Sequence, residues 1–303
     1  MTESHRKDAV AGVLYGLAAY GSWGFLAVYF KWVASVHPLE ILAHRIVWSV
    51  AVLAILITAS RGWPAMRAIA GHGRSLRFLA ITTCLIATNW YIFIWAVTRD
   101  HMVEASLGYF MNPLVNVLLG FFFLREHLRR WEWVSVAIAG LAVAWLVLAA
   151  GVFPWISLTL AVSFGMYGLL RKIAGVASIG GLAIETAILL PFAAAYLVMR
   201  ARDGSLAFGH VSTSLDLLLL AAGPFTALPL LWFASAVRRL RLATVGLLQY
   251  IAPSIQFTLA VAVYHEPFDR TRMIAFILIW IAIAIYSVDN FRKRNVPRVT
   301  RPA

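Results

Sequence analysis

The chain has 303 residues, of which 62% are hydrophobic and 13% charged, and its formal net charge is +13. A soluble domain averages about half apolar and about a quarter charged residues, so this composition excludes an ordinary soluble domain and indicates a membrane protein. The basic residues occur in small groups between apolar runs rather than along one polar face, which argues against a nucleic-acid partner and leaves the lipid bilayer as the expected environment.

Ten stretches of the chain are mostly apolar and about 20 residues long, the length that a helix needs to cross a bilayer. The first follows the short polar segment 1–9, and because it has no small-residue cleavage site we expect it to remain as an uncleaved span. The predicted fold class is therefore an all-α integral membrane protein with ten transmembrane helices. The expected spans cover residues 10–30, 39–60, 76–98, 104–124, 131–149, 154–171, 180–199, 214–236, 242–264 and 271–289.

A block near the middle of the chain recurs 140 residues later. Pro113 and Glu126 in the first copy match Pro253 and Glu266 in the second. Each copy belongs to a unit of five apolar stretches, an odd number, so the second unit must enter the membrane from the opposite side. Inverted repeats of this kind are typical of secondary transporters. The two predicted five-helix repeats span residues 10–150 and 151–290.

The lysines and arginines are distributed unequally between the two sides of the membrane. With the N-terminus inside, 19 of them fall on the cytoplasmic side and 6 on the outer side, while Arg45 lies within a span. Because cytoplasmic loops are enriched in basic residues, the segment 1–9 and the tail 291–303 are both predicted to be cytoplasmic. The basic tail is expected to be a solvated flank that contacts anionic lipid, in preference to a partner-binding segment.

Two adjacent ionisable residues, His44 and Arg45, lie within the second stretch. Ionisable groups at membrane depth are costly, so each requires a partner or a water-filled surrounding. The planar guanidinium of Arg45 suits an anionic group on a substrate, which makes both residues candidates for a substrate site. The alternative is an internal ion pair, for which the candidate carboxylates are Glu40, Glu104 and Asp100.

Glu185 in the seventh stretch is the position that matches Arg45 in the repeat. Because its span runs outward from the cytoplasm, Glu185 is expected nearer the cytoplasmic face. A partly buried carboxylate could exchange a proton during transport, so Glu185 is the candidate for proton coupling. A static ion pair with Arg171 or Lys172, near the same end of the span, is equally compatible with the sequence.

The matched prolines Pro113 and Pro253 predict interruptions of the fourth and ninth helices, since proline lacks a backbone donor and clashes with the preceding turn. Interrupted helices at matching positions of two halves point to a central binding site. The polar and aromatic residues near the two prolines are further candidates for lining that site, namely Tyr109, Asn112, Gln249 and Tyr250.

Aromatic residues are concentrated in the third stretch, where Asn89 precedes Trp90 and Trp95 follows one and a half turns later. Trp23 in the first stretch corresponds approximately to Tyr167 in the sixth, and each is followed by a glycine. These rings could line a cavity for an amphipathic or aromatic solute. Packing against lipid is the alternative for each ring taken singly.

Together, several motifs resemble the RarD-type permeases, bacterial inner-membrane members of the EamA branch of the drug/metabolite transporter superfamily. The resemblance covers about residues 10–289 and implies two inverted five-helix repeats around a central cavity. It also implies a permease, in a family whose name is associated with chloramphenicol sensitivity, whereas other members of the superfamily carry amino acids and other metabolites. The motifs are His44-Arg45, Asn89-Trp90 with Trp95-Ala96-Val97, the run from Glu104 to Pro113, Glu185-Thr186 with Leu189-Leu190-Pro191, and Gln249-Tyr250 with Pro253.

The sequence therefore predicts an inner-membrane secondary transporter that moves a small amphipathic metabolite or drug by alternating access, with the proton as candidate coupling ion. The alternatives are an amino-acid exporter or exchanger of the same superfamily, and a channel or non-transporting membrane scaffold. An enzyme is not expected, because His265-Glu266 lacks the second histidine of a zinc-protease helix, no nucleophile elbow is present and no pair of aspartates lies within a span. No nucleotide-binding P-loop occurs, so ATP-driven transport would need another chain. No metal or other cofactor is predicted, and the single cysteine, Cys84, allows no internal disulfide.

Overall fold

The computed structural model is helical throughout its described part, in which no strand occurs. The described residues are 3–125, 127–151, 153–174, 178–240, 244–245 and 248–294. Glu126 and the end of the basic tail beyond Arg294 lie outside them. The helices are α1 (Glu3–Trp32), α2 (Pro38–Ala59), α3 (Trp63–Gly71), α4 (Gly73–Thr98), α5 (Met102–Leu124), α6 (Arg130–Ala150), α7 (Trp155–Ala174), α8 (Ser178–Arg202), α9 (Thr213–Arg239), α11 (Ile251–Thr258), the π-helical η1 (Leu259–Val263) and α12 (Arg270–Arg294).

Eight of these helices are long and apolar enough to cross a bilayer, namely α1, α2, α4, α5, α6, α8, α9 and α12. The predicted sixth and ninth spans correspond to shorter apolar helices, Trp155–Arg171 within α7 and Ile251–Val263 in α11 and η1. Part of the predicted ninth span, residues 241–243 and 246–247, lies outside the described residues. The prediction of an all-α integral membrane protein is confirmed for the described chain.

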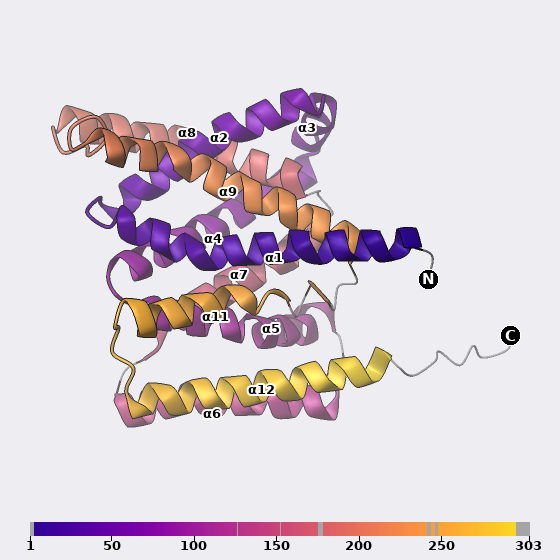
Figure 1. The fold of residues 1–303 in the computed structure, drawn as a ribbon. Coiled ribbons are helices and arrows are strands. Elements are labelled where there is room, and N and C mark those ends of the chain that lie inside the picture. Colours follow the sequence, from indigo (N-terminus) through magenta and orange to yellow (C-terminus); the bar gives the residue numbers. More distant parts are fainter. Residues whose placement is uncertain are drawn as a thin grey trace, which may run out of the picture.

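One helix was not predicted. α3 follows α2 directly, begins with Trp63 and Pro64, and has nine residues, which is too short to cross a bilayer. Proline fits this position because the first turn of a helix needs no backbone donor. None of the residues of α3 is buried, so it lies on the surface at one end of the bundle (Figure 1).

The long helices lie side by side in Figure 1, and the N- and C-termini emerge at the same end of the molecule. α1 packs against α9 and α11, while α7 packs against α4 and α5. α2 contacts α8 and α9, and α6 and α12 pair at one edge of the bundle. Helices from the two halves of the chain are therefore interleaved rather than segregated.

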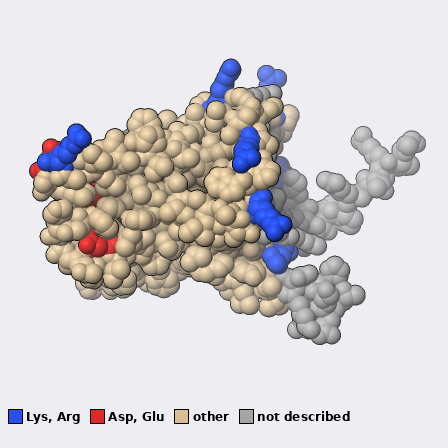
Figure 2. All heavy atoms as spheres, turned by 90° about the horizontal axis from the view of Figure 1, so that it is seen from above, with Lys and Arg blue, Asp and Glu red and all other residues tan. Residues whose placement is uncertain are grey.

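The outer surface of the bundle is apolar, whereas charged side chains gather at its ends. Large hydrophobic residues such as Leu148, Phe192 and Phe122 are exposed, as expected of a surface covered by lipid. Figure 2 shows lysine and arginine side chains gathered at the end that carries the termini, which we call the basic end. Its described members include Arg61, Arg67, Arg77, Arg129, Arg130 and Arg239. The opposite end includes the connections 33–37, 99–101, 203–212 and 264–269.

Candidate functional site

Arg45 of α2 lies where four helices meet, with 6% of its surface exposed. Its Nε donates a hydrogen bond of 2.9 Å to the hydroxyl of Thr226 on α9. That hydroxyl donates its own proton to the carbonyl of Ala222, so it can only accept from the guanidinium. The guanidinium carbon lies 4.2 Å from the ring centroid of Trp90 on α4 and 5.9 Å from that of Phe30 on α1. We call Arg45, Phe30, Trp90, Thr226 and the nearby Tyr109 the Arg45 site.

No carboxylate of the described chain forms an ion pair with Arg45. The three carboxylates considered as its partners bind elsewhere: Glu40 pairs with Arg200 (3.7 Å), Glu104 with Arg272 (2.8 Å), and Asp100 with Lys31. A desolvated cation–π contact contributes about 2 kcal/mol, whereas an unpaired buried charge costs several kcal/mol. The contact with Trp90 therefore does not offset the burial of this guanidinium.

Glu185 of α8 is fully buried and its carboxylate has polar partners on two other helices. Thr82 of α4 donates a hydrogen bond of 2.6 Å to one oxygen, and Tyr167 of α7 donates one of 3.1 Å to the other. Arg171 lies 3.6 Å away, so the ion pair considered from the sequence is present. The side chain of Lys172, the other candidate, lies outside the described part of the structure.

The contacts of Arg45 and Glu185 correspond to each other across the 140-residue repeat. Arg45 on the second helix of the first half bonds to Thr226 on α9, the third long helix of the second half. Glu185 on the second helix of the second half bonds to Thr82 on α4, the third of the first half. The two threonines were not predicted, because threonine is ordinary in membrane helices and their partners lie more than 100 residues away.

Three of the predicted polar residues connect α4 and α5 to α7. Asn89 donates a hydrogen bond of 3.1 Å to the carbonyl of Leu160, and Tyr109 donates one of 3.1 Å to the side-chain oxygen of Asn89. Asn112 donates one of 3.2 Å to the carbonyl of Ala161. Tyr109 also lies within electrostatic range of Arg45, so these groups join the Arg45 site to the helix that carries Tyr167.

Among the described contacts, none joins Arg45 to the other predicted aromatic residues. Trp95 stacks on His101 at the opposite end, with ring centroids 5.3 Å apart. Trp23 packs against Phe233, and Tyr250 stacks over Phe110 at 6.4 Å.

His44 is next to Arg45 in the sequence, but its side chain contacts other residues. Its Nδ1 accepts a hydrogen bond of 3.3 Å from Trp48, and its ring packs against Phe208 at 4.9 Å. Gln249 lies in the turn that precedes α11, with no contact to the Arg45 site among those the structure describes.

The two prolines differ in their relation to the predicted helix interruptions. α5 continues as one helix through Pro113, so the expected interruption is not found there. Pro253 lies in the first turn of α11, directly after the turn formed by Gln249 and Tyr250. At this position the missing backbone donor costs nothing, because the first turn of a helix leaves its N–H groups free in any case.

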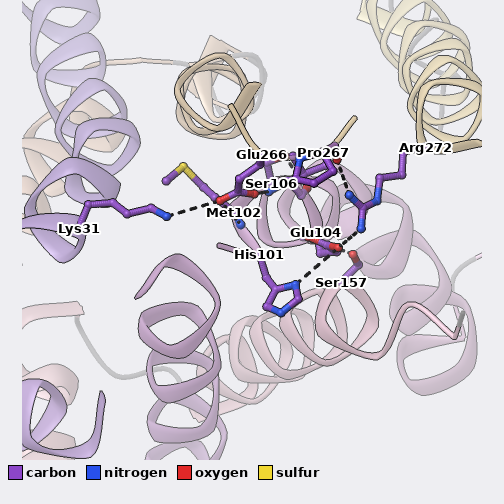
Figure 3. Close-up of polar contacts among 10 residues, drawn as sticks. Lys31, His101, Met102, Glu104, Ser106, Ser157, Glu266, Pro267 and Arg272 are labelled. Carbon is purple, nitrogen blue, oxygen red and sulfur yellow. Dashed lines mark hydrogen bonds and ion pairs between the residues drawn. The ribbon is translucent and has the colours of Figure 1, made fainter. Parts of the chain in front are cut away.

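Glu266 closes the opposite end of the bundle, a role that the sequence did not reveal beyond its match with Glu126 (Figure 3). Its two carboxylate oxygens accept the backbone N–H groups of Met102 and Val103, at 3.0 and 2.9 Å, and so cap the N-terminus of α5. Lys31 at the end of α1 lies 3.7 Å from the same carboxylate. A carboxylate at a helix N-terminus is stabilised by the free N–H groups and by the helix dipole.

A second carboxylate extends this closure (Figure 3). Glu104 on α5 pairs with Arg272 on α12 at 2.8 Å and lies 3.7 Å from His101. Its backbone carbonyl accepts a hydrogen bond of 2.6 Å from Ser157 on α7. Together with Glu266, these contacts hold the ends of α1, α5, α7 and α12 together.

A helical bundle with an apolar exterior and ionisable side chains buried between its halves defines a multi-pass membrane protein with a polar interior. Residues 10–148 match the EamA-like transporter family. The chain is 44% identical to an uncharacterized transporter of Vibrio cholerae over 98% of both chains, and 44% identical to Protein RarD of Escherichia coli K12 over 93% of this chain and 96% of that protein. It therefore belongs to the RarD-type permeases of the EamA family, which are multi-pass bacterial membrane transporters. A solved crystal structure, 22% identical, shares the fold with a TM-score of 0.58 over 93% of this chain and 98% of that one.

Proposed function

We propose that this protein is a secondary transporter that moves a small amphipathic metabolite or drug across the bacterial inner membrane by alternating access. The observation that carries the proposal is the pair of crossed contacts, Arg45 to Thr226 and Glu185 to Thr82. Each joins the two halves of the chain. Arg45 and Glu185 each lie about two turns from the start of their helices, and α2 and α8 begin at opposite ends of the bundle. Two halves linked by polar contacts at different depths can exchange one set of contacts for the other, which is what alternating access requires.

The proposal includes ten spans arranged as two inverted five-helix repeats, residues 10–150 and 151–290. Helix packing supports this arrangement, because the contact of α1 with α9 has its counterpart in the contact of α7 with α4. The contact of α1 with α11 likewise has its counterpart in that of α7 with α5. The basic end seen in Figure 2 supports cytoplasmic N- and C-termini, since cytoplasmic loops are enriched in lysine and arginine.

Within this transporter, we assign substrate contact first to Arg45, Trp90 and Tyr109, which lie together. The remaining candidates for the substrate path are Trp23, His44, Asn89, Trp95, Asn112, Tyr167, Gln249 and Tyr250. Glu185 is the candidate for proton coupling, because it is a buried carboxylate that hydroxyl donors surround. The closure by Glu266 and Glu104 would serve as the outer gate, which must open when the transporter faces outward.

Counterflow in proteoliposomes tests the proposal. We expect purified protein to exchange labelled solutes saturably with an excess of unlabelled solute, for at least one member of a panel of amino acids, aromatic acids, aromatic amides and phenicols. Empty liposomes serve as one control and the exposed-site variant Arg67→Gln as another. Flux at channel rates would favour a channel, and no exchange of any solute would favour a non-transporting scaffold. Exchange restricted to amino acids would support the amino-acid exporter.

A further inference from the structure

Arg45 differs from five other basic side chains that are at least partly buried in the described bundle. Each of those five has a carboxylate within 4 Å. Lys31 pairs with Asp100 and Glu266, Arg129 with Glu132 and Asp289, Arg171 with Glu185, Arg200 with Glu40, and Arg272 with Glu104. Arg45 is more deeply buried than several of them and has only a hydroxyl and aromatic rings around it. Within the described residues, Arg45 is therefore a buried positive charge without a carboxylate partner.

The geometry of Arg45 leaves a specific part of the guanidinium free. Within the described chain its hydrogen bond from Nε to Thr226 is the only one that it donates. That bond fixes the plane of the guanidinium. The N–H groups of its two terminal nitrogens remain able to donate to a ligand. Two parallel N–H groups are the arrangement that binds the two oxygens of a carboxylate. The residue as a whole is 6% exposed, so its burial is not complete.

The surroundings of Arg45 restrict the class of anion. The rings of Trp90 and Phe30 lie 4.2 and 5.9 Å from the guanidinium, so the body of the ligand would meet an aromatic surface. A phosphate dianion would need a second free cation, but Arg171 and Arg200 are both engaged by glutamates. An ammonium group would need a carboxylate, but the carboxylates buried in the described chain already bind basic side chains or backbone N–H groups, namely Glu40, Glu104, Glu185 and Glu266.

We propose that the Arg45 site binds the carboxylate of a monoanionic substrate with an aromatic or otherwise apolar body and no amino group. This inference rests on the proposed transport function, and it narrows the substrate class of the same site. The two terminal amino groups of Arg45 hold the carboxylate, Thr226 holds the guanidinium in place, and Trp90 packs against both the cation and the apolar body.

Equilibrium binding to the purified full-length protein in lipid nanodiscs tests this assignment. The probes are radiolabelled phenylacetate and indole-3-acetate, with phenylacetamide, indole-3-acetamide and phenylalanine as competitors of matched shape. We expect each acid to bind at least tenfold more tightly than its amide, and phenylalanine to compete no better than the amides. In Arg45→Gln the preference for acid over amide should disappear, in Arg45→Lys it should persist in weakened form, and in Arg67→Gln, on the exposed α3, it should be unchanged.

Equal binding of acid and amide by the wild-type protein, binding of phenylalanine in preference to the acids, or absence of any acid binding would overturn the inference. The comparison within the wild type remains decisive even if Arg45→Gln does not fold. A preference for acids that survives in folded Arg45→Gln would place the anion elsewhere and also overturn it.

Counterflow separates this inference from the transport function. Exchange of amides or amino acids without acids leaves a transporter and removes the acid site, whereas acid binding without exchange does the reverse.

Discussion

Single side chains decide how the buried charges of this protein are accommodated. The carboxylate of Glu185 accepts hydrogen bonds from two hydroxyl groups and pairs with Arg171, whereas Arg45 has no described counter-charge. The two residues lie 140 positions apart, the offset of the sequence repeat, and carry opposite charges. This asymmetry assigns them different tasks in our proposal, proton exchange for Glu185 and anion binding for Arg45.

Removal of the hydrogen bond from Thr82 should destabilise the fold. In Thr82→Val the buried carboxylate of Glu185 loses its 2.6 Å donor, and we expect a loss of about 1–3 kcal/mol in the free energy of unfolding. The matched control is Thr83→Val, because Thr83 is equally buried on α4 but donates only to the carbonyl of Leu79 in its own helix. Denaturation in detergent measures both variants, and equal stability of the two would contradict the role given to Thr82.

Glu185→Gln tests proton coupling. Glutamine keeps the shape of the side chain, and its single oxygen can still accept from one of the two donors, Thr82 or Tyr167, but it does not take up a proton. We expect solute exchange by the variant to lose the pH dependence of the wild type while binding of the solute is retained. Glu132→Gln, at the N-terminus of α6, is the control. A pH profile that Glu185→Gln leaves unchanged would show that the carboxylate is structural.

At the scale of helices, the opposite end of the bundle is held by caps and ion pairs between elements that are distant in sequence. Glu266 lies after η1 but caps α5, and Arg272 on α12 reaches Glu104 on α5. When these hydrogen bonds and ion pairs separate, water that enters can bind the freed polar groups, so the free-energy cost is small. Water does not replace the apolar contacts along the helices in this way. The ends of the helices are therefore the natural place for a gate.

Weakening the cap should open that gate. In a Cys84→Ser background, Ser106→Cys places a thiol on α5 at a buried position one turn beyond Met102. We expect Glu266→Gln to increase its labelling rate by a membrane-impermeant maleimide several-fold, because glutamine loses the charge that Lys31 and the helix N-terminus stabilise. Asp269→Asn, which alters the exposed start of α12, is the control. An unchanged labelling rate in Glu266→Gln would remove Glu266 from the gate.

At the scale of the whole molecule, the distribution of charge defines two unlike ends. Lysine and arginine gather at the end with the termini. At the opposite end, carboxylates form ion pairs with a few basic residues (Figures 2 and 3). An apolar exterior separates these ends. The molecule is thus built to lie in a bilayer with a defined orientation, and that orientation can be measured directly.

Reporter fusions test the orientation. Green fluorescent protein joined after Arg294 should fluoresce and alkaline phosphatase at the same point should be inactive, because the basic end is expected in the cytoplasm. Alkaline phosphatase joined after Ser205, in the connection between α8 and α9, should be active. The reverse pattern would contradict the orientation and with it the assignment of the Glu266 closure to the outer side.

The sequence by itself determined where the long apolar helices lie, though not the short α3, because length and hydropathy are local properties that the bilayer selects. It also identified Arg45 and Glu185 as exceptional, since a charge within an apolar stretch is visible without any structure. Only the tertiary structure decided their partners, the absence of a described carboxylate beside Arg45, the cap that Glu266 provides, and the continuity of α5 through Pro113. These features depend on how helices more than 100 residues apart are rotated and packed against one another, and no local pattern encodes that rotation.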